Sequence, residues 1–177
     1  MYGFEDINDL QILEFTQNKN GSHFVLFDKK NNNKMNFKTN MIGKHNVLNV
    51  AAAIAVALDE GIPYEGIKKA LEKFIVIERR FQLISENVFE KDIILIDDYG
   101  HHPKELLVSI NTAKEVWPDR EILVVFQPHR YTRTKALFED FVSILSDCKN
   151  LILLEIYPAS EEPCLLYTSD AADDSRS

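Results

Sequence analysis

The sequence has little cysteine and no long apolar run. Its two cysteines, Cys148 and Cys164, fit neither a CxxC redox motif nor a zinc-site spacing. No apolar stretch approaches the roughly 20 residues that cross a bilayer, and the first residues lack the basic and apolar regions of a signal peptide. We therefore expect a cytoplasmic protein that has no disulfide framework and makes no use of a membrane.

Positive charge is also scarce, with 20 Lys and Arg against 28 Asp and Glu and a net charge of −8. This balance argues against a broad nucleic-acid surface, so any local cluster of basic residues needs a local explanation. The chain is 45% hydrophobic with only six Gly and six Pro among 177 residues. Such a composition excludes disordered and collagen-like classes and leaves room for one domain or two small ones.

Residues 164–177 differ in character from the rest of the chain. They show no periodicity, and they interrupt an alternation of strands and helices. Read back into codons, residues 164–173 resemble the translation of a transposon-end sequencing adapter. We interpret 164–177 as a non-native, adapter-derived tail and leave it out of the reasoning on fold and function.

The first part of the chain predicts short antiparallel strands followed by helices. Apolar stretches alternate with polar turns over residues 10–40, which indicates strands at 10–15, 23–28 and 35–39. From residue 46 to 58 the spacing becomes helical, with Val47, Val50, Ala51, Ile54 and Leu58 forming one buried stripe. A second helix is expected at 64–74, after Pro63.

The second part alternates strands and helices. The apolar runs 93–96 and 122–126 are typical of strands buried on both faces, and a third strand is expected at 151–154. Between them, we expect a helix from Pro103 that ends before Pro118 and another at 135–145. The inward stripe of the latter comprises Leu137, Phe138, Phe141, Val142 and Leu145. This order predicts an α/β fold with a parallel sheet and right-handed crossovers.

Polar residues follow the first of these strands at the end where parallel sheets bind ligands. Residues 97–103, Asp-Asp-Tyr-Gly-His-His-Pro, place two acids, two imidazoles and a phenol in one strand-to-helix turn. The plain alternative is a helix start with an acidic cap. His101 and His102 are adjacent and diverge, which does not match the ligand spacing of metal sites.

The loop after the second strand concentrates cations in an otherwise acidic chain. Residues 127–134, Gln-Pro-His-Arg-Tyr-Thr-Arg-Thr, contain His129, Arg130 and Arg133. A guanidinium group can donate two parallel hydrogen bonds to the oxygens of a carboxylate or phosphate, so this loop is a candidate anion-binding site. The plain alternative is a basic turn that is exposed to solvent. The third loop, 156–159, is a candidate wall of the same cleft.

Two carboxamides, Asn46 and Asn49, lie three residues apart at the start of the Ala-rich helix. Asn46 could be the N-cap of this helix, or the pair could contact a base edge. Gly43-Lys44 is not a phosphate loop, because G-x-x-x-x-G-K-[ST] is absent from the chain. If ATP is used, we expect its triphosphate to be held elsewhere.

Five segments together resemble the Mur ligases, which add amino acids to the peptidoglycan precursor. They are HNVLNVAAAIAVA (45–57), RRFQ (79–82), IDDYGHHP (96–103), FQPHRYTRT (126–134) and YPA (157–159). HNxxN with an RF pair is shared with the folylpolyglutamate ligases. DDYGHHP with FQPHRYTRT is narrower and is similar to the branch that joins L-alanine to UDP-N-acetylmuramate. The likeness covers about residues 35–163.

The resemblance implies a domain division and a reaction. Residues 1–79 would end a central ATP-binding domain, and 80–163 would begin a Rossmann-like C-terminal domain. The family phosphorylates a carboxylate of its substrate with ATP and Mg²⁺, and an amine then attacks the acyl phosphate to give an amide. The phosphate loop, the Mg²⁺ ligands and the UDP-binding domain are expected outside this chain, which leads us to expect that the chain alone is inactive.

The same resemblance implies roles for individual residues. His45, Asn46 and Asn49 would bind adenine, and Arg80 and Asp98 would hold ribose and phosphate. Tyr99, His129, Arg130 and Arg133 would surround the amino acid, with Arg80, His129 and Arg130 taking catalytic roles. The expected small-molecule partners are UDP-N-acetylmuramate and L-alanine.

Two alternatives stay open at this point. One is a related ligase that attaches a preformed murein tripeptide. That ligase also carries an acidic HHP loop, but its sequence differs from this chain at the FQPHRYTRT segment. The other is a nucleotide-binding module without chemistry of its own, which the missing phosphate loop favours.

Overall fold

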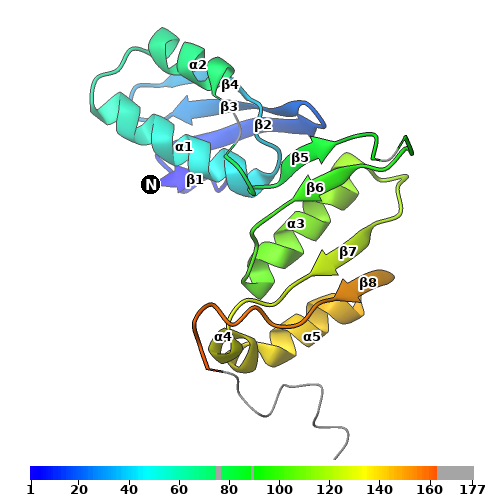
Figure 1. The fold of residues 1–177 in the computed structure, drawn as a ribbon. Coiled ribbons are helices and arrows are strands. Elements are labelled where there is room, and N and C mark those ends of the chain that lie inside the picture. The colour runs from blue at the N-terminus through cyan, green and yellow to red at the C-terminus, as the bar shows by residue number, and fades with distance from the viewer. Residues whose placement is uncertain (75–76, 89, 163–177) are drawn as a thin grey trace, which may run out of the picture. The chain divides into compact units, whose positions relative to one another are not determined.

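The computed structural model describes residues 1–74, 77–88 and 90–162, so the proposed tail lies outside the described residues. The chain divides into two compact units (Figure 1). Unit 1 comprises residues 1–99 and 115–118, and unit 2 comprises residues 100–114 with the chain from Asp119 onward.

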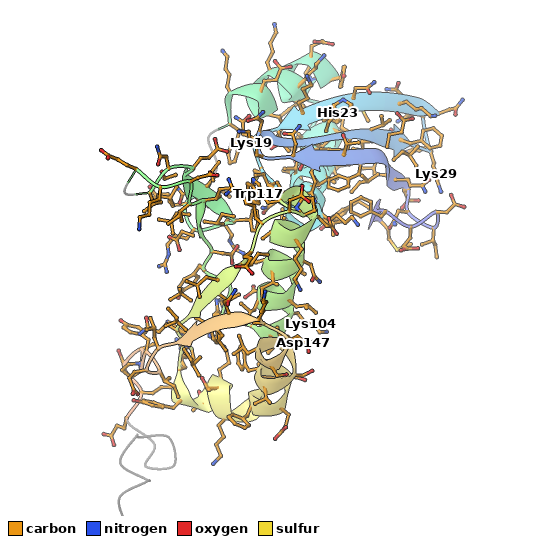
Figure 2. All side chains as sticks on the ribbon, turned by 90° about the vertical axis from the view of Figure 1, so that its right-hand side faces the viewer. Lys19, His23, Lys29, Lys104, Trp117 and Asp147 are labelled. Atoms are coloured by element: carbon orange, nitrogen blue, oxygen red, sulfur yellow. The ribbon has the colours of Figure 1, made fainter. Side chains whose placement is uncertain are left out.

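Unit 1 is built on a four-stranded sheet of order β1-β2-β3-β4. Its strands are β1 (Tyr2–Gly3), β2 (Leu10–Asn18), β3 (Gly21–Asp28) and β4 (Asn33–Thr39). β2, β3 and β4 pair antiparallel, which confirms the expected hairpins, whereas the short parallel strand β1 has no clear sequence signal. Lys19 and Lys29 mark the two opposite turns that flank β3 (Figure 2).

Gly21 makes the first hairpin possible. Its φ is +127°, and a Cβ there would lie 2.1 Å from the carbonyl oxygen of Thr39 on β4. Only glycine accepts both this backbone conformation and the close approach. The preceding turn is stabilised by the Asn20 backbone N–H, which donates to Asn18 Oδ1 at 2.8 Å.

Two helices cover one face of this sheet, α1 (Lys44–Asp59) and α2 (Tyr64–Lys73). The predicted stripe of α1 is confirmed for Val47, Val50, Ala51 and Ile54, which pack with Phe24, Leu26 and Phe37 of the sheet. Leu58 is only partly buried. The hydrophobic core of unit 1 therefore lies between the sheet and its helices.

Unit 1 also contains β5 (Gln82–Ser85) and β6 (Leu95–Asp97), which pair antiparallel. The sequence did not predict β5. Ile93 and Leu95 are each 46% exposed, so the expectation of a strand buried on both faces at 93–96 is wrong. The reason is that, among the described residues, β6 has a single strand neighbour.

Unit 2 contains α3 (Pro103–Val116), β7 (Leu123–Phe126), α4 (Tyr131–Ala136), α5 (Phe138–Ser146) and β8 (Asn150–Leu153). The last two residues of α3, Glu115 and Val116, are assigned to unit 1. β7 and β8 pair in parallel, which confirms the predicted parallel sheet (Figure 1). Leu106, Ile110, Val124, Phe126 and Phe141 form its core. Leu123 and Val125 are exposed, so β7 is covered on one face only, contrary to the expectation for 122–126.

The helix expected at 135–145 is in fact two helices. Leu137 has φ −118° and separates α4 from α5, so the chain bends within the predicted stripe. Within α5, Phe141 is buried and Leu145 packs against the same core, but Phe138 and Val142 lie on another face of the helix and are exposed. The expected inward stripe is therefore confirmed for Leu137, Phe141 and Leu145 and is wrong for Phe138 and Val142.

Candidate functional site

The loop after β6 is held by interactions with the connector at residues 79–82. The Arg79 guanidinium lies 4.7 Å from the centre of the Tyr99 ring, and its Nε is 3.4 Å from Asp97 Oδ2. The Tyr99 N–H donates to the carbonyl oxygen of Arg79 at 2.8 Å. Tyr99 is therefore oriented by Arg79, a residue that the sequence had not singled out beside Arg80.

Asp98 has a structural partner in this region. The backbone N–H of Phe81 donates to Asp98 Oδ2 at 2.8 Å, and Phe81 is 3% exposed with φ +51°. Its ring stacks with that of Trp117 (labelled in Figure 2) at 6.4 Å between centres. The Asp98 carboxylate thus fixes an unusual backbone conformation next to Arg80, whose own side chain is exposed.

His101 and His102 lie at the start of α3, where Glu105 caps the helix. Both backbone N–H groups donate to Glu105 Oε2, at 3.0 and 3.1 Å. This is the carboxylate half of a capping box, so α3 does start at an acidic cap, but the capping acid is Glu105 and not Asp97 or Asp98 of the loop. His102 Nδ1 in turn accepts a hydrogen bond from the Lys104 backbone N–H.

The loops after β7 and β8 are bound to each other and continue the parallel ladder. Leu154 N–H donates to the carbonyl oxygen of Phe126, and Tyr157 N–H donates to that of Pro128 at 2.8 Å. Arg130 N–H then donates to the carbonyl oxygen of Tyr157 at 2.8 Å. The prediction that residues 156–159 lie beside the basic loop agrees with these bonds.

Arg130 adopts a strained backbone conformation, with φ +74° and ψ +132°. Its carbonyl oxygen accepts hydrogen bonds from the Thr134 hydroxyl at 2.8 Å and the Thr134 N–H at 3.1 Å. Non-glycine residues keep such conformations where surrounding bonds fix them on both sides, which is common at binding sites. The side chain of Arg130 is exposed.

His129 lies between two other rings in unit 2. Its ring centre is 5.3 Å from that of Tyr157 and 6.1 Å from that of His101. Burial lowers the pKa of His129, and the neighbouring Arg133 and Arg130 guanidinium groups lower it further. Both effects favour the neutral imidazole over the imidazolium form. Arg133 is half-buried, and its Nη1 donates to the carbonyl oxygen of His129 at 3.4 Å.

Asn46 and Asn49 have different surroundings at the start of α1. Asn46 is fully buried, and its Nδ2 donates to the carbonyl oxygen of Ile42 at 2.7 Å, while its Oδ1 has no hydrogen-bond partner among the described residues. Asn49 is exposed. The expectation that Asn46 caps the helix is wrong, because Gly43, with φ +104°, is the N-cap.

The turn that leads into α1 is fixed by side chains from several strands. Gln17 Oε1 accepts from Gly43 N–H at 2.9 Å, and the Ser22 hydroxyl donates to the carbonyl oxygen of Met41 at 2.8 Å. With the Asn46 bond, three side chains hold residues 41–43. Neighbouring His45 is half-buried. This network places the first turn of α1 rigidly on the sheet.

Within residues 1–74, 77–88 and 90–162, no group of three His, Cys, Asp or Glu side chains is arranged to hold a metal ion. No helix in this part of the chain is long and apolar enough to cross a membrane. Cys148 is a free, half-buried thiol whose pKa is raised by burial, and Cys164 lies outside the described residues.

Sequence reasoning assigned no role to Arg79, Glu105 or Glu161, and it included Tyr157 only as part of the expected wall at 156–159. The first two carried local signals, since Arg79 adjoins the RF pair and Glu105 stands at the usual capping distance from His102. Glu161 bonds to Thr132, 29 residues earlier in the sequence, so no local pattern could have identified it.

Family models match both parts of the chain. Residues 79–172 match the model described as Mur ligase, glutamate ligase domain, which alone covers more than half of the chain. Residues 1–57 match the Mur ligase middle domain. The mixed α/β fold with its parallel β7–β8 pair is that of these two domains.

Several solved structures are similar. The UDP-N-acetylmuramate-alanine ligase MurC from Thermotoga maritima has a TM-score of 0.68 and 28% identity, covering 87% of this chain and 39% of that chain. MurF from Acinetobacter baumannii has a TM-score of 0.63 and 20% identity, with coverages of 86% and 32%. The folylpolyglutamate synthetase from Lactobacillus casei has a TM-score of 0.61 and 17% identity, with coverages of 89% and 37%.

The last two likenesses show a shared fold only. The chain spans less than half the length of each of these three proteins. With one family model matching most of its second part and another matching its beginning, this chain belongs to the Mur ligase family.

Proposed function

We propose that the chain is part of an ATP-dependent ligase that joins L-alanine to UDP-N-acetylmuramate in peptidoglycan precursor synthesis. The observation that carries the proposal is the basic loop of unit 2, where the Arg130 N–H donates to Tyr157 in the loop after β8 and the Arg133 guanidinium donates to the carbonyl oxygen of His129. Two guanidinium groups suit the carboxylate of an amino acid. The structure with 28% identity, whose name includes alanine ligase, supports the same choice.

The chemistry assigns separate tasks to these residues. ATP transfers its γ-phosphoryl group to the substrate carboxylate, ADP leaves, and the alanine nitrogen then attacks the acyl carbon and expels phosphate. Arg133 and Arg130 bind the alanine carboxylate. His129 accepts a proton from the alanine ammonium group, which must become a neutral amine before it attacks.

On the nucleotide side, we assign Asn49, the exposed carboxamide, and half-buried His45 to the adenine, whereas fully buried Asn46 acts through the turn that it holds. Asp98 binds a ribose hydroxyl and Arg80 offsets charge on the phosphates during transfer. We also keep Tyr99 as a proposed substrate-binding residue. A related structure, described as a complex of FPGS with AMPPCP and folate, shows that a protein of this fold binds an ATP analogue.

Mg²⁺ would neutralise phosphate charge in such a ligase. The described residues contain no ligand cluster that fits it, so we place its ligands in the part of the ligase beyond this chain and assign no step here to the metal. The phosphate loop is placed there for the same reason, because its motif is absent from this sequence.

The deciding experiment is an assay of the complete ligase that contains this chain. Phosphate release is measured with UDP-N-acetylmuramate, ATP and Mg²⁺ in the presence of either L-alanine or a murein tripeptide. We expect release that depends on L-alanine. Release that depends on the tripeptide alone would identify the recycling ligase instead, and no release with either would favour a nucleotide-binding module.

A further inference from the structure

The first turn of α4, which follows Arg130, is capped from a distant part of the chain. Thr132 N–H donates to Glu161 Oε2 at 3.0 Å, and the Thr132 hydroxyl donates to Glu161 Oε1 at 2.6 Å. The N-cap residue of α4, Arg130, makes no side-chain cap bond of its own. Glu161 therefore takes the place that a local Ser, Thr or Asp usually fills at a helix start.

This cap matters because α4 is short and its start is strained. The helix has six residues, too few to be stable without outside contacts, and it begins at Arg130 with φ +74°. A carboxylate at the N-terminus satisfies free N–H groups and is attracted by the helix dipole. Bonds from Thr132 and Tyr131, together with the charge of Arg130, lower the pKa of Glu161, so it stays ionised at neutral pH.

Glu161 is itself held in place by the loop that carries Tyr157. Its N–H donates to the carbonyl oxygen of Pro158 at 3.0 Å, and Tyr157 is bonded to Pro128 and Arg130 through its backbone. The segment 157–161 is thus hydrogen-bonded to the basic loop on both sides of Arg130, through Tyr157 to Pro128 and through Glu161 to Thr132. Arg130 and Arg133 lie in the segment that these bonds fix.

We propose that Glu161 is a positioning residue that sets the geometry of Arg130 and Arg133 for the carboxylate of the amino-acid substrate. It acts through Thr132 and does not touch the substrate. The Glu161 carboxylate accepts hydrogen bonds from the Thr132 N–H and hydroxyl and also interacts with the charge of Arg130. This inference rests on the proposed function for the identity of the substrate. The hydrogen bonds between Glu161 and Thr132 do not depend on the proposed function.

The kinetic test uses the complete ligase with Glu161→Ala and the matched control Glu162→Ala, whose exposed side chain is the immediate neighbour. We expect Glu161→Ala to raise the KM for L-alanine about tenfold while the KM for ATP stays within about twofold, because a charge-assisted pair is lost at one loop only. Glu162→Ala should leave both values unchanged. Equal rises in both KM values, or a fall in kcat alone, would overturn the proposal.

Variants at Thr132 separate positioning from general loss of folding. Thr132→Val removes the hydroxyl donor and should raise the KM for L-alanine, and Thr132→Ser restores the donor and should return it to the wild-type value. Glu161→Gln keeps one acceptor and should lie between Glu161→Ala and wild type. Failure of Thr132→Ser to rescue would contradict the role.

A second readout needs no activity at all. In the 177-residue chain, amide hydrogen exchange at Thr132 should become faster in Glu161→Ala than in Glu162→Ala. If the wild-type ligase does not use L-alanine, the proposed function fails, and this exchange measurement still decides whether Glu161 fixes the loop. Unchanged amide exchange at Thr132 in Glu161→Ala would refute the claim that Glu161 fixes the start of α4.

Discussion

The antiparallel sheet of unit 1 and the parallel pair of unit 2 use apolar residues differently. Phe24, Leu26 and Phe37 are each less than 2% exposed beneath α1 and α2, whereas Leu123 and Val125 of β7 are each 57% exposed. The basic loop belongs to the second, half-covered unit. Its order therefore depends less on a deep core than on polar bonds such as those of Tyr157 and Glu161.

The difference follows from how the strands are connected. Hairpin strands meet their neighbours within a few residues, and the helices that follow cover them at once. A parallel pair needs a crossover, here α4 and α5, and each strand depends on neighbours that are further away in sequence. A stable scaffold and a loop held by hydrogen bonds are thus separate parts of this chain, and substitutions can test them separately.

The largest expected effect lies in the unit 1 core. Phe24→Ala should lower the free energy of unfolding by about 3–5 kcal/mol, because it leaves a cavity under α1. Val56→Ala, at a 64% exposed position of the same helix, should stay within about 0.5 kcal/mol. Urea unfolding followed by circular dichroism measures both. A small loss for Phe24→Ala would mean that this core is less closely packed than described.

Next in size is a paired test on β7. Val124→Ala should cost about 1–3 kcal/mol because Val124 packs in the unit 2 core, whereas Val125→Ala should cost less than about 0.5 kcal/mol because its side chain is exposed. The same unfolding measurement applies. If the two losses are equal, both faces of β7 are covered and the contrast between the units is wrong.

A nucleotide-side prediction concerns Asp98. In the complete ligase, Asp98→Ala should raise the KM for ATP roughly tenfold, more than the KM for L-alanine, since a ribose hydroxyl loses its acceptor. Asp98→Asn keeps an oxygen that can accept from the Phe81 N–H and should preserve the local fold better. Steady-state kinetics with one substrate varied at a time checks this. If only the KM for L-alanine rises, Asp98 belongs to the amino-acid site and not to the nucleotide site.

The smallest expected effect is the pH dependence that His129 contributes. Its folded-state pKa is lowered from 6.5, so the unfolded chain binds a proton more readily and stability falls as the pH drops below about 6.5. His129→Gln should remove the contribution of His129 to this fall in stability at low pH. Thermal melting at pH 7.5 and 5.5 should show a larger decrease in Tm for wild type than for the variant, and equal decreases would contradict the shifted pKa.

Much of the fold could be predicted because its signals are local. The alternation over residues 10–40 and the stripe of α1 both depend on neighbours within one turn or one strand. The helix from Pro103 was correct for the same reason. The split between α4 and α5 was missed because Leu137 fits an apolar stripe in sequence, and only tertiary packing shows the bend there.

Site residues were harder to predict than elements. Asn46 and Asn49 share a helix face by spacing, yet three residues turn a helix by about 300°, and at the edge of a core one is buried while the other is exposed. Glu161 could not be found from sequence because its partner Thr132 lies in α4, 29 residues earlier in the chain. The basic loop itself was visible because cations are rare in this chain.

The most direct test of the central claim is the Arg133→Ala variant of the complete ligase. Arg133 is half-buried in the basic loop, and loss of a bidentate pair with a carboxylate costs roughly tenfold to a hundredfold in affinity. We predict that the KM for L-alanine rises by that factor while the KM for ATP changes by less than about twofold. An unchanged KM for L-alanine with a raised KM for ATP would show that the basic loop binds the nucleotide and not the amino acid.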